Sequence, residues 1–304
     1  MMNPRAIACF GAVHADLIAH GARPVLRETS TPGTIAMTPG GVATNVARAL
    51  ARLSVPVRLA GAVGTDSDGT SLHRLLSEDG IDLSALARAD LPTGRYVALH
   101  DPDGSLAGAI CDTSITDSLD AGFIAHAAGR LDGCPIWFAE ANLPDDALAE
   151  LAERAGERLL VADAVSSAKA PRLAALAGRL DLVFLNRAEA AAWTGFAEAT
   201  PAVPLALAVA ALGPRQVILS DGAGLLTMVE DGRPLQIEPG AVEIVDVTGA
   251  GDALIAGTLA GLARGLPLED AAHAGLVAAR LTLEATGAVA PSLAWDNICP
   301  VLAR

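Results

Sequence analysis

The sequence has few lysines, few cysteines and no long apolar run, and each shortage excludes a class of protein. Basic residues number 21 against 35 acidic ones, so the net charge of −14 argues against nucleic acid as a partner. The four cysteines are scattered without a CxxC pair, which argues against a zinc site or a disulfide framework. No uncharged run reaches the roughly 18 residues of a membrane span, and the N-terminus lacks a signal-peptide pattern. We expect a cytoplasmic protein that binds no membrane.

Short apolar runs alternate with helical stretches along most of the 304 residues. Strands are expected at 7–12, 57–63, 136–139, 159–162, 182–185, 217–220 and 242–247. This alternation predicts an α/β fold whose mainly parallel sheet is covered by helices on both faces. The segment 14–37 is polar and dotted with Pro and Gly, and 94–112 alternates like a β-hairpin. We expect a single domain over 1–304 with a small β-sheet lid formed from about 14–37 and 94–112.

The most informative motif is Asp246-Val247-Thr248-Gly249-Ala250-Gly251-Asp252, which leads from an expected strand into a small-residue helix. The backbone N–H groups of residues 249–251 would form an anion nest at the positive end of that helix. Asp252 beside this nest could take a proton from a hydroxyl that attacks a phosphoryl group. A helix N-terminus capped by an Asp is the structural alternative.

Polar groups also follow the first strand and the segment after it. No G-x-G-x-x-G follows residues 7–12, which argues against a dinucleotide-binding dehydrogenase. Asp16 instead lies just past the end of this strand. Gly40 and Gly41 would let a ligand approach the backbone closely, and Asn45 would point its amide at the same place one turn into a helix.

Two later motifs follow strands of the second half. Asn186 and Glu189 are spaced to hold the water shell of Mg²⁺, or equally to form a helix capping box. Ser220-Asp221-Gly222-Ala223-Gly224 could pass the phosphates or ribose of a nucleotide. Taken alone, each of these motifs is a weak signal.

The order of the motifs along the whole chain resembles the ribokinase-like (PfkB) carbohydrate kinase family. The series consists of Gly-Gly…Asn, Gly64-x-Asp66-x-x-Gly69, Asn-x-x-Glu, Ser-x-Gly-x-Gly and the closing Asp-x-x-Gly-Ala-Gly-Asp. The resemblance implies a ribokinase-like three-layer α/β/α domain that uses ATP and Mg²⁺, and in many members a monovalent cation such as K⁺. It also implies a homodimer formed through the lid, whose alternating pattern over 96–110 would otherwise leave an apolar face exposed.

Within that family the sequence looks most like the subgroup that phosphorylates pseudouridine. His14, the run Thr93-Gly94-Arg95-Tyr96 and the segment 163–169 carry this likeness, although the subgroup has Pro where this chain has Ala164. The implied catalytic residues are Asp252 as general base and Gly249, Ala250 and Gly251 as anion hole. The implied substrate-binding residues are His14, Asp16, Gly40, Gly41, Asn45, Tyr96, Asp112 and Lys169. The implied nucleotide-binding residues are Asn186, Glu189, Ser220, Gly222, Gly224 and Thr248. The implied metal sites are Glu189 and Asn186 for Mg²⁺ through water, and Asp246, Val247, Gly287 and Ser292 for a monovalent cation.

Several alternatives stay open at the level of sequence. The substrate could be ribose, a ribonucleoside or 2-keto-3-deoxygluconate instead of pseudouridine. A non-catalytic sugar or nucleoside sensor is a different class, which loss of Asp252 would favour, but that residue is present. Lys169, the only lysine, marks a site that needs a compact ammonium or survives by chance. Tyr96, the only tyrosine, could cover the substrate or pack on the lid sheet.

Overall fold

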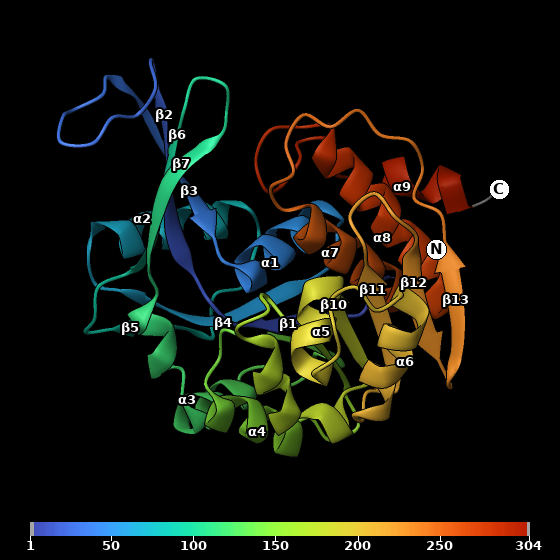
Figure 1. Ribbon diagram of the computed structural model, residues 1–304. Helices are drawn as coiled ribbons and strands as arrows, with labels where there is room; N and C mark the ends of the chain where they lie inside the picture. The colour runs from blue at the N-terminus through green and yellow to red at the C-terminus, as the bar shows by residue number, and fades with distance from the viewer. Residues whose placement is uncertain (1–2, 303–304) are drawn as a thin grey trace.

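A computed structural model describes residues 3–302 and contains a nine-stranded, mostly parallel sheet between two layers of helices (Figure 1). The strand order is β13-β12-β11-β10-β9-β8-β1-β4-β5, and only the β11–β12 and β12–β13 pairs in this order are antiparallel. The strands are β1 (Ile7–Phe10), β4 (Val57–Gly64), β5 (Leu86–Ala89), β8 (Ile136–Glu140), β9 (Leu159–Asp163), β10 (Leu182–Asn186), β11 (Gln216–Ser220), β12 (Leu226–Glu230) and β13 (Arg233–Ile237). The expected α/β fold is confirmed.

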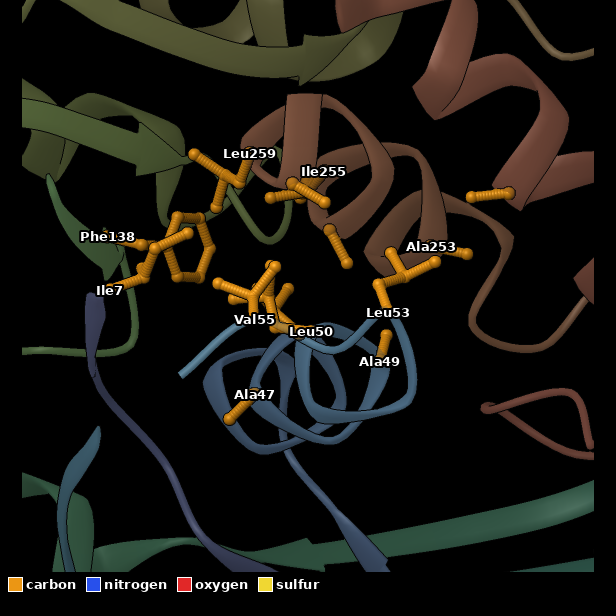
Figure 2. Close-up of a cluster of buried hydrophobic side chains, with 14 of the residues drawn as sticks. Ile7, Ala47, Ala49, Leu50, Leu53, Val55, Phe138, Ala253, Ile255 and Leu259 are labelled. Atoms are coloured by element: carbon orange, nitrogen blue, oxygen red, sulfur yellow. The ribbon is translucent and has the colours of Figure 1, made fainter. Parts of the chain in front are cut away.

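Successive residues of β1 point to opposite faces of the sheet, because side chains alternate along a strand. Ile7 and Cys9 belong to one buried cluster, with residues of α1, α7 and α8, whereas Ala8 and Phe10 belong to the other, with residues of α3, α4 and α6. Figure 2 shows part of the first cluster, in which Ile7 and Phe138 of the sheet lie close to side chains of α1 and α7. This packing fixes the starts of α1 and α7 over the sheet.

The helices have the following bounds: α1 (Val42–Arg52), α2 (Ser67–Glu78), α3 (Ala121–Ala128), α4 (Asp145–Arg154), α5 (Arg187–Thr194), α6 (Ala202–Ala211), α7 (Ala250–Ala263), α8 (Leu268–Leu283) and α9 (Trp295–Leu302). Short 3₁₀ helices are η1 (Ser114–Ser118), η2 (Ala170–Ala175) and η3 (Ala177–Arg179). Within the described range, no helix is both long and apolar enough to cross a membrane.

A separate four-stranded sheet with the order β3-β2-β6-β7 projects from the main body (Figure 1). It is formed by β2 (His14–Gly21), β3 (Gly33–Gly40), β6 (Gly94–His100) and β7 (Leu106–Asp112). The β2–β6 pair is parallel, and the other two pairs are antiparallel. The small second sheet expected from the sequence is therefore confirmed. We call it the lid sheet.

The prediction of a strand at 242–247 is wrong. That segment has no regular secondary structure, and Ile244, Val245 and Val247 are 58%, 59% and 69% exposed. The hairpin of β12 and β13 occupies the edge of the main sheet, so the chain that follows it runs outside the sheet. The backbone N–H groups of Val245 and Asp246 donate instead to the Leu283 carbonyl, at 2.8 and 3.2 Å. An apolar run alone could not reveal that the edge was taken.

Candidate active site

Four neighbouring strands of the main sheet each end on a polar residue. These residues are Glu140 of β8, Asp163 of β9, Asn186 of β10 and Ser220 of β11. Glu140 is in register with Asp163, and Asn186 is in register with Ser220. Ligands of α/β sheets bind outside the carboxyl ends of the strands, so this edge is the expected location of a site.

Asp252, in the first turn of α7, is joined to Asn45 of α1 across this edge. The Asn45 Nδ2 amide donates to Asp252 Oδ2 at 2.8 Å, although the two residues are 207 positions apart. Burial, together with the nearby Glu140 and Asp16 charges, raises the pKa of Asp252 to about 7 against the lowering effect of the Asn45 hydrogen bond. A carboxyl group whose pKa lies near neutrality is suited to exchanging a proton with a ligand.

Gly249 caps α7 in a conformation that only glycine adopts easily. Its φ is 75°, and a side chain there would collide with the Ala288 carbonyl. The first-turn N–H groups of an α-helix have no partner inside the helix, so the start of α7 can attract an anion. The Ala250 N–H contacts the Val247 carbonyl at 3.4 Å. The residues expected to form the anion hole, Gly249, Ala250 and Gly251, lie at the positive end of α7 directly before Asp252, and their binding of an anion stays a prediction.

Two neighbouring strands of the lid sheet carry candidate substrate residues. Asp16 of β2 is in register with Tyr96 of β6, so both lie on one face of that sheet. Gly40 of β3 packs so closely on the Asp16 carboxylate that any side chain there would clash. Burial raises the pKa of Asp16 to about 6. Asp112 behaves differently, because its register partner is Arg95, which places it on the opposite face from Asp16.

Three buried polar atoms of this region have no hydrogen-bond partner within the part of the chain that is described. They are Asp16 Oδ1, Asn45 Oδ1 and His14 Nε2. Leaving such an atom unpaired costs roughly 1–3 kcal/mol, which a ligand could recover by hydrogen bonding. The arrangement therefore fits a ligand rich in hydroxyl groups.

Glu140 is a central residue that sequence reasoning missed. Its side chain is fully buried, and Oε1 accepts the Ala12 N–H at 2.6 Å while Oε2 accepts the Ala43 N–H at 2.9 Å. Burial raises the pKa of Glu140, and these hydrogen bonds act in the opposite direction. The carboxylate thus ties the turn after β1 to the start of α1. The only available signal was that the apolar run 136–139 is followed by an acid.

The lone lysine belongs to the same network. Lys169 Nζ donates to Asn142 Oδ1, and Asn142 Nδ2 donates to Glu140 Oε1 at 2.9 Å. Burial and the Lys169 charge lower the pKa of His14 to about 4, so His14 is neutral near pH 7. Asp163 is a second residue of this region that sequence reasoning did not place in the site. Its pKa is raised by burial and by the charges of Glu189, Asp252 and Glu140.

Asn186 and Glu189 form a reciprocal capping box at the start of α5. Asn186 Oδ1 accepts the Glu189 N–H at 3.0 Å, and Glu189 Oε2 accepts the Asn186 N–H at 2.8 Å. The helix capping box, which the sequence equally predicts as the alternative to a Mg²⁺ site, is therefore present. Burial raises the pKa of Glu189. The nucleotide loop expected at Ser220, Gly222 and Gly224 begins on β11, directly beside Asn186.

The carboxylates of this edge, Asp163 and Glu189 among them, could take part in a cation site. Among the described side chains, no group of three His, Cys, Asp or Glu is close enough together to hold a metal by itself. Burial raises the pKa of both Asp163 and Glu189, and the negative charges of Glu189, Asp252 and Glu140 raise that of Asp163 further, an effect that a nearby cation would relieve. Mg²⁺ often binds through one or two carboxylates, its own waters and substrate phosphates, so the residues fit that type of site.

Asp246 connects the two loops of the expected monovalent-cation site. Its Oδ1 accepts the Thr248 N–H and its Oδ2 accepts the Gly287 N–H, both at 2.9 Å. Burial acts to raise the pKa of Asp246, but these hydrogen bonds outweigh burial and lower the pKa below its ordinary value. Val247 and Ser292 are exposed. Cation binding here stays a prediction.

The chain is similar to known proteins in both sequence and fold. The model of the pfkB family carbohydrate kinases matches residues 4–295. Pseudouridine kinase of Escherichia coli is 26% identical over 96% of this chain and 95% of its own length. A carbohydrate kinase from Agrobacterium tumefaciens superposes with a TM-score of 0.87 at 28% identity, covering 98% of this chain and 97% of that one. Arabidopsis thaliana ribokinase, solved with ribose and ATP, superposes with a TM-score of 0.85 at 20% identity, with full coverage of both chains.

The family match spans the whole site, from the first strand to the loop after α8. Its members that resemble this chain are named kinases of sugars and nucleosides, so the chain is a phosphotransferase that acts on an alcohol group of such a compound. ATP is the phosphoryl donor expected for this family. With Asp252, Asn45 and the start of α7 assembled at the carboxyl edge of the sheet, the chain belongs to the pfkB family of carbohydrate kinases.

Proposed function

We propose that the protein transfers the γ-phosphoryl group of ATP to the 5′-hydroxyl of pseudouridine. The products would be pseudouridine 5′-phosphate and ADP. The observation that carries the proposal is Asp252, a half-buried carboxyl with a pKa of about 7, held by Asn45 in the first turn of α7.

Asp252 accepts the hydroxyl proton as the substrate oxygen attacks the γ-phosphorus, and the bond to the bridging oxygen of ADP breaks. The N–H groups of Gly249, Ala250 and Gly251 stabilise the charge on the transferring group. Glu189 and Asn186 would hold Mg²⁺ through water, and the ion would supply positive charge that stabilises the phosphates. The lid sheet would exclude water, so that ATP is not hydrolysed in place of transfer.

The choice of a nucleoside rests on the other end of the site. The unpaired Asp16 Oδ1 and Asn45 Oδ1 suit ribose hydroxyls. His14 and Lys169 offer a neutral imidazole and an ammonium close to one another, which suits the carbonyl oxygens of a uracil base. The likeness to the Escherichia coli pseudouridine kinase, at 26% identity, supports this choice. Which base the nucleoside carries is decided by the experiment below.

The test is ADP release from Mg·ATP with pseudouridine, uridine, adenosine, ribose and 2-keto-3-deoxygluconate as acceptors. We expect kcat/KM to be highest with pseudouridine and the product to carry its phosphate at the 5′ position. A higher kcat/KM with any other acceptor would replace pseudouridine while keeping the Asp252 mechanism. Fast ADP release without acceptor would contradict the role given to the lid sheet.

A further inference from the structure

A polar cavity lies at the opposite edge of the main sheet from the candidate active site. It has a volume of about 400 Å³ and is lined by residues at the amino ends of the strands, among them Pro135 before β8, Leu159 of β9 and Asp181 before β10. Each of these strands has five residues, so it separates the two edges by roughly 16 Å. The cavity is therefore distinct from the kinase site.

The cavity concentrates positive charge in an acidic protein. Its lining contains two acids, Glu157 and Asp181, and four arginines, Arg5, Arg158, Arg179 and Arg215. The chain as a whole has a net charge of −14. A local excess of arginine in a concave site attracts anions by focusing the electrostatic field.

Two of the arginines are held firmly in place. Arg179 donates to Asp181 Oδ2 at 2.8 Å and to the carbonyls of Gly156 and Arg158, both at 2.6 Å. Arg158 contacts Asp132 Oδ1 at 3.2 Å and lies 4.7 Å from the centre of the Trp137 ring. Asp181 also accepts the Leu160 N–H at 2.8 Å. These contacts form a fixed wall of the cavity.

The other two arginines keep most of their donors free. Arg215 is 81% exposed, and within the described chain its polar partner is Asp181 Oδ1, at 3.5 Å. Arg5 donates one N–H to the Leu262 carbonyl at 2.7 Å. A guanidinium has five N–H donors in a planar fork that matches the oxygens of a phosphate.

We propose that this cavity is a second anion site, which binds a small phosphate-bearing metabolite through Arg215 and Arg5. Arg158 and Arg179 supply the fixed positive wall. A volume of about 400 Å³ is within the range of small-molecule sites and is too small for a polyanion. The inference does not rest on the kinase activity, because no residue of the candidate active site takes part.

The test compares phosphate binding by two charge-reversal variants. Inorganic phosphate, ribose 5-phosphate and ADP are titrated separately by calorimetry at low ionic strength, into wild type, Arg215→Glu and Arg74→Glu. Arg74 is the matched control, since it is an exposed arginine paired with Glu78 and is remote from the cavity lining. Arg5→Ala is a second test variant, which serves if Arg215→Glu does not fold.

We expect Arg215→Glu to raise the Kd of at least one of the three ligands about tenfold or more. Arg74→Glu should change the Kd of each ligand less than about twofold. The ligand that is lost shows whether free phosphate, a sugar phosphate or a nucleotide is preferred. Equal losses in both variants would mean a general charge effect and would overturn the proposal. So would a result in which phosphate and ribose 5-phosphate bind wild type no tighter than about 10 mM and ADP binds wild type and Arg215→Glu equally well, since ADP also binds at the proposed kinase site.

Discussion

Asp252 lies in an environment that differs strongly from that of an ordinary surface acid. Burial and the charges of Glu140 and Asp16 favour its protonated form, whereas the Asn45 amide favours the carboxylate. These opposing effects leave the pKa at about 7, close to the value at which a general base is most effective. A solvated helix-capping Asp would keep a pKa near 4.

The first prediction concerns the pH dependence of the kinase. The general base must be deprotonated, so kcat/KM should rise with pH through an apparent pKa of about 7 and then level off. Asp252→Asn should lower kcat by about 10²–10⁴-fold and remove this rise. A variant with near-normal turnover, or a wild-type profile that is flat between about pH 6 and 8, would contradict the role of Asp252.

Stability gives an independent control for the same variant. Since burial raises the folded-state pKa of Asp252, its favourable effect on folding is present below about pH 4 and is lost as pH rises through about 7. The buried carboxylate then destabilises the fold at alkaline pH. Asp252→Asn should therefore melt higher than wild type at about pH 8, which also shows that lost activity is not lost folding. A lower melting temperature there would argue against the raised pKa.

At the scale of single elements, the start of α7 depends on one backbone conformation. Gly249 is left-handed at φ 75°, and a side chain there would collide with the Ala288 carbonyl, whereas Gly251, two residues later, has open space where a side chain would go. The two glycines of the motif thus have different structural roles. The sequence motif alone does not distinguish the two glycines.

The second prediction compares alanine at these two positions. Gly249→Ala should destabilise the protein by about 1–3 kcal/mol, because the strained conformation and the collision add together. Gly251→Ala should be neutral or stabilising by up to about 1 kcal/mol, since alanine is the better helix former. Urea unfolding of both variants measures this. Equal losses of stability would show that the N-terminal conformation of α7 is not what the structure describes.

At the scale of the whole molecule, the lid sheet carries an apolar face away from Asp16. Leu17, Met37 and Val97 share this face with Ile110 according to the strand register. Ile110 is 75% exposed, and Ile35 further along β3 is 74% exposed. An apolar sheet face of this kind is usually covered by a partner, and a second copy of the chain is the partner that the family resemblance implies.

The third prediction is that the protein is a homodimer through this face. Light scattering at micromolar concentration should give twice the chain mass of 30.7 kDa, and Ile110→Glu should give a monomer. Leu212→Glu is the matched control, because Leu212 is 44% exposed at the end of α6, far from the lid sheet in the fold. A monomeric wild type, or a dimer that survives Ile110→Glu, would contradict the prediction.

The strands and helices were largely predictable because the period of apolar residues reports local structure directly. The expected runs at 57–63, 159–162 and 182–185 became β4, β9 and β10 with ends shifted by at most one residue. The run at 242–247 has the same apolar character but lies outside the sheet. Strand pairing depends on which edges are free, and that depends on residues far away in the sequence.

The sequence by itself determined the alternation of strands and helices, the order of the glycine-rich motifs and the presence of Asp252 at a helix start. Each element and each motif is a local property, carried by residues within a few positions of one another, and the order of the motifs is read directly along the chain. Only the tertiary structure decided that Asn45 bonds Asp252, that Glu140 ties two loops together, and that the pKa of Asp252 lies near 7. Burial, charge coupling and hydrogen bonds act through space, so they arise only when the chain has brought distant segments together.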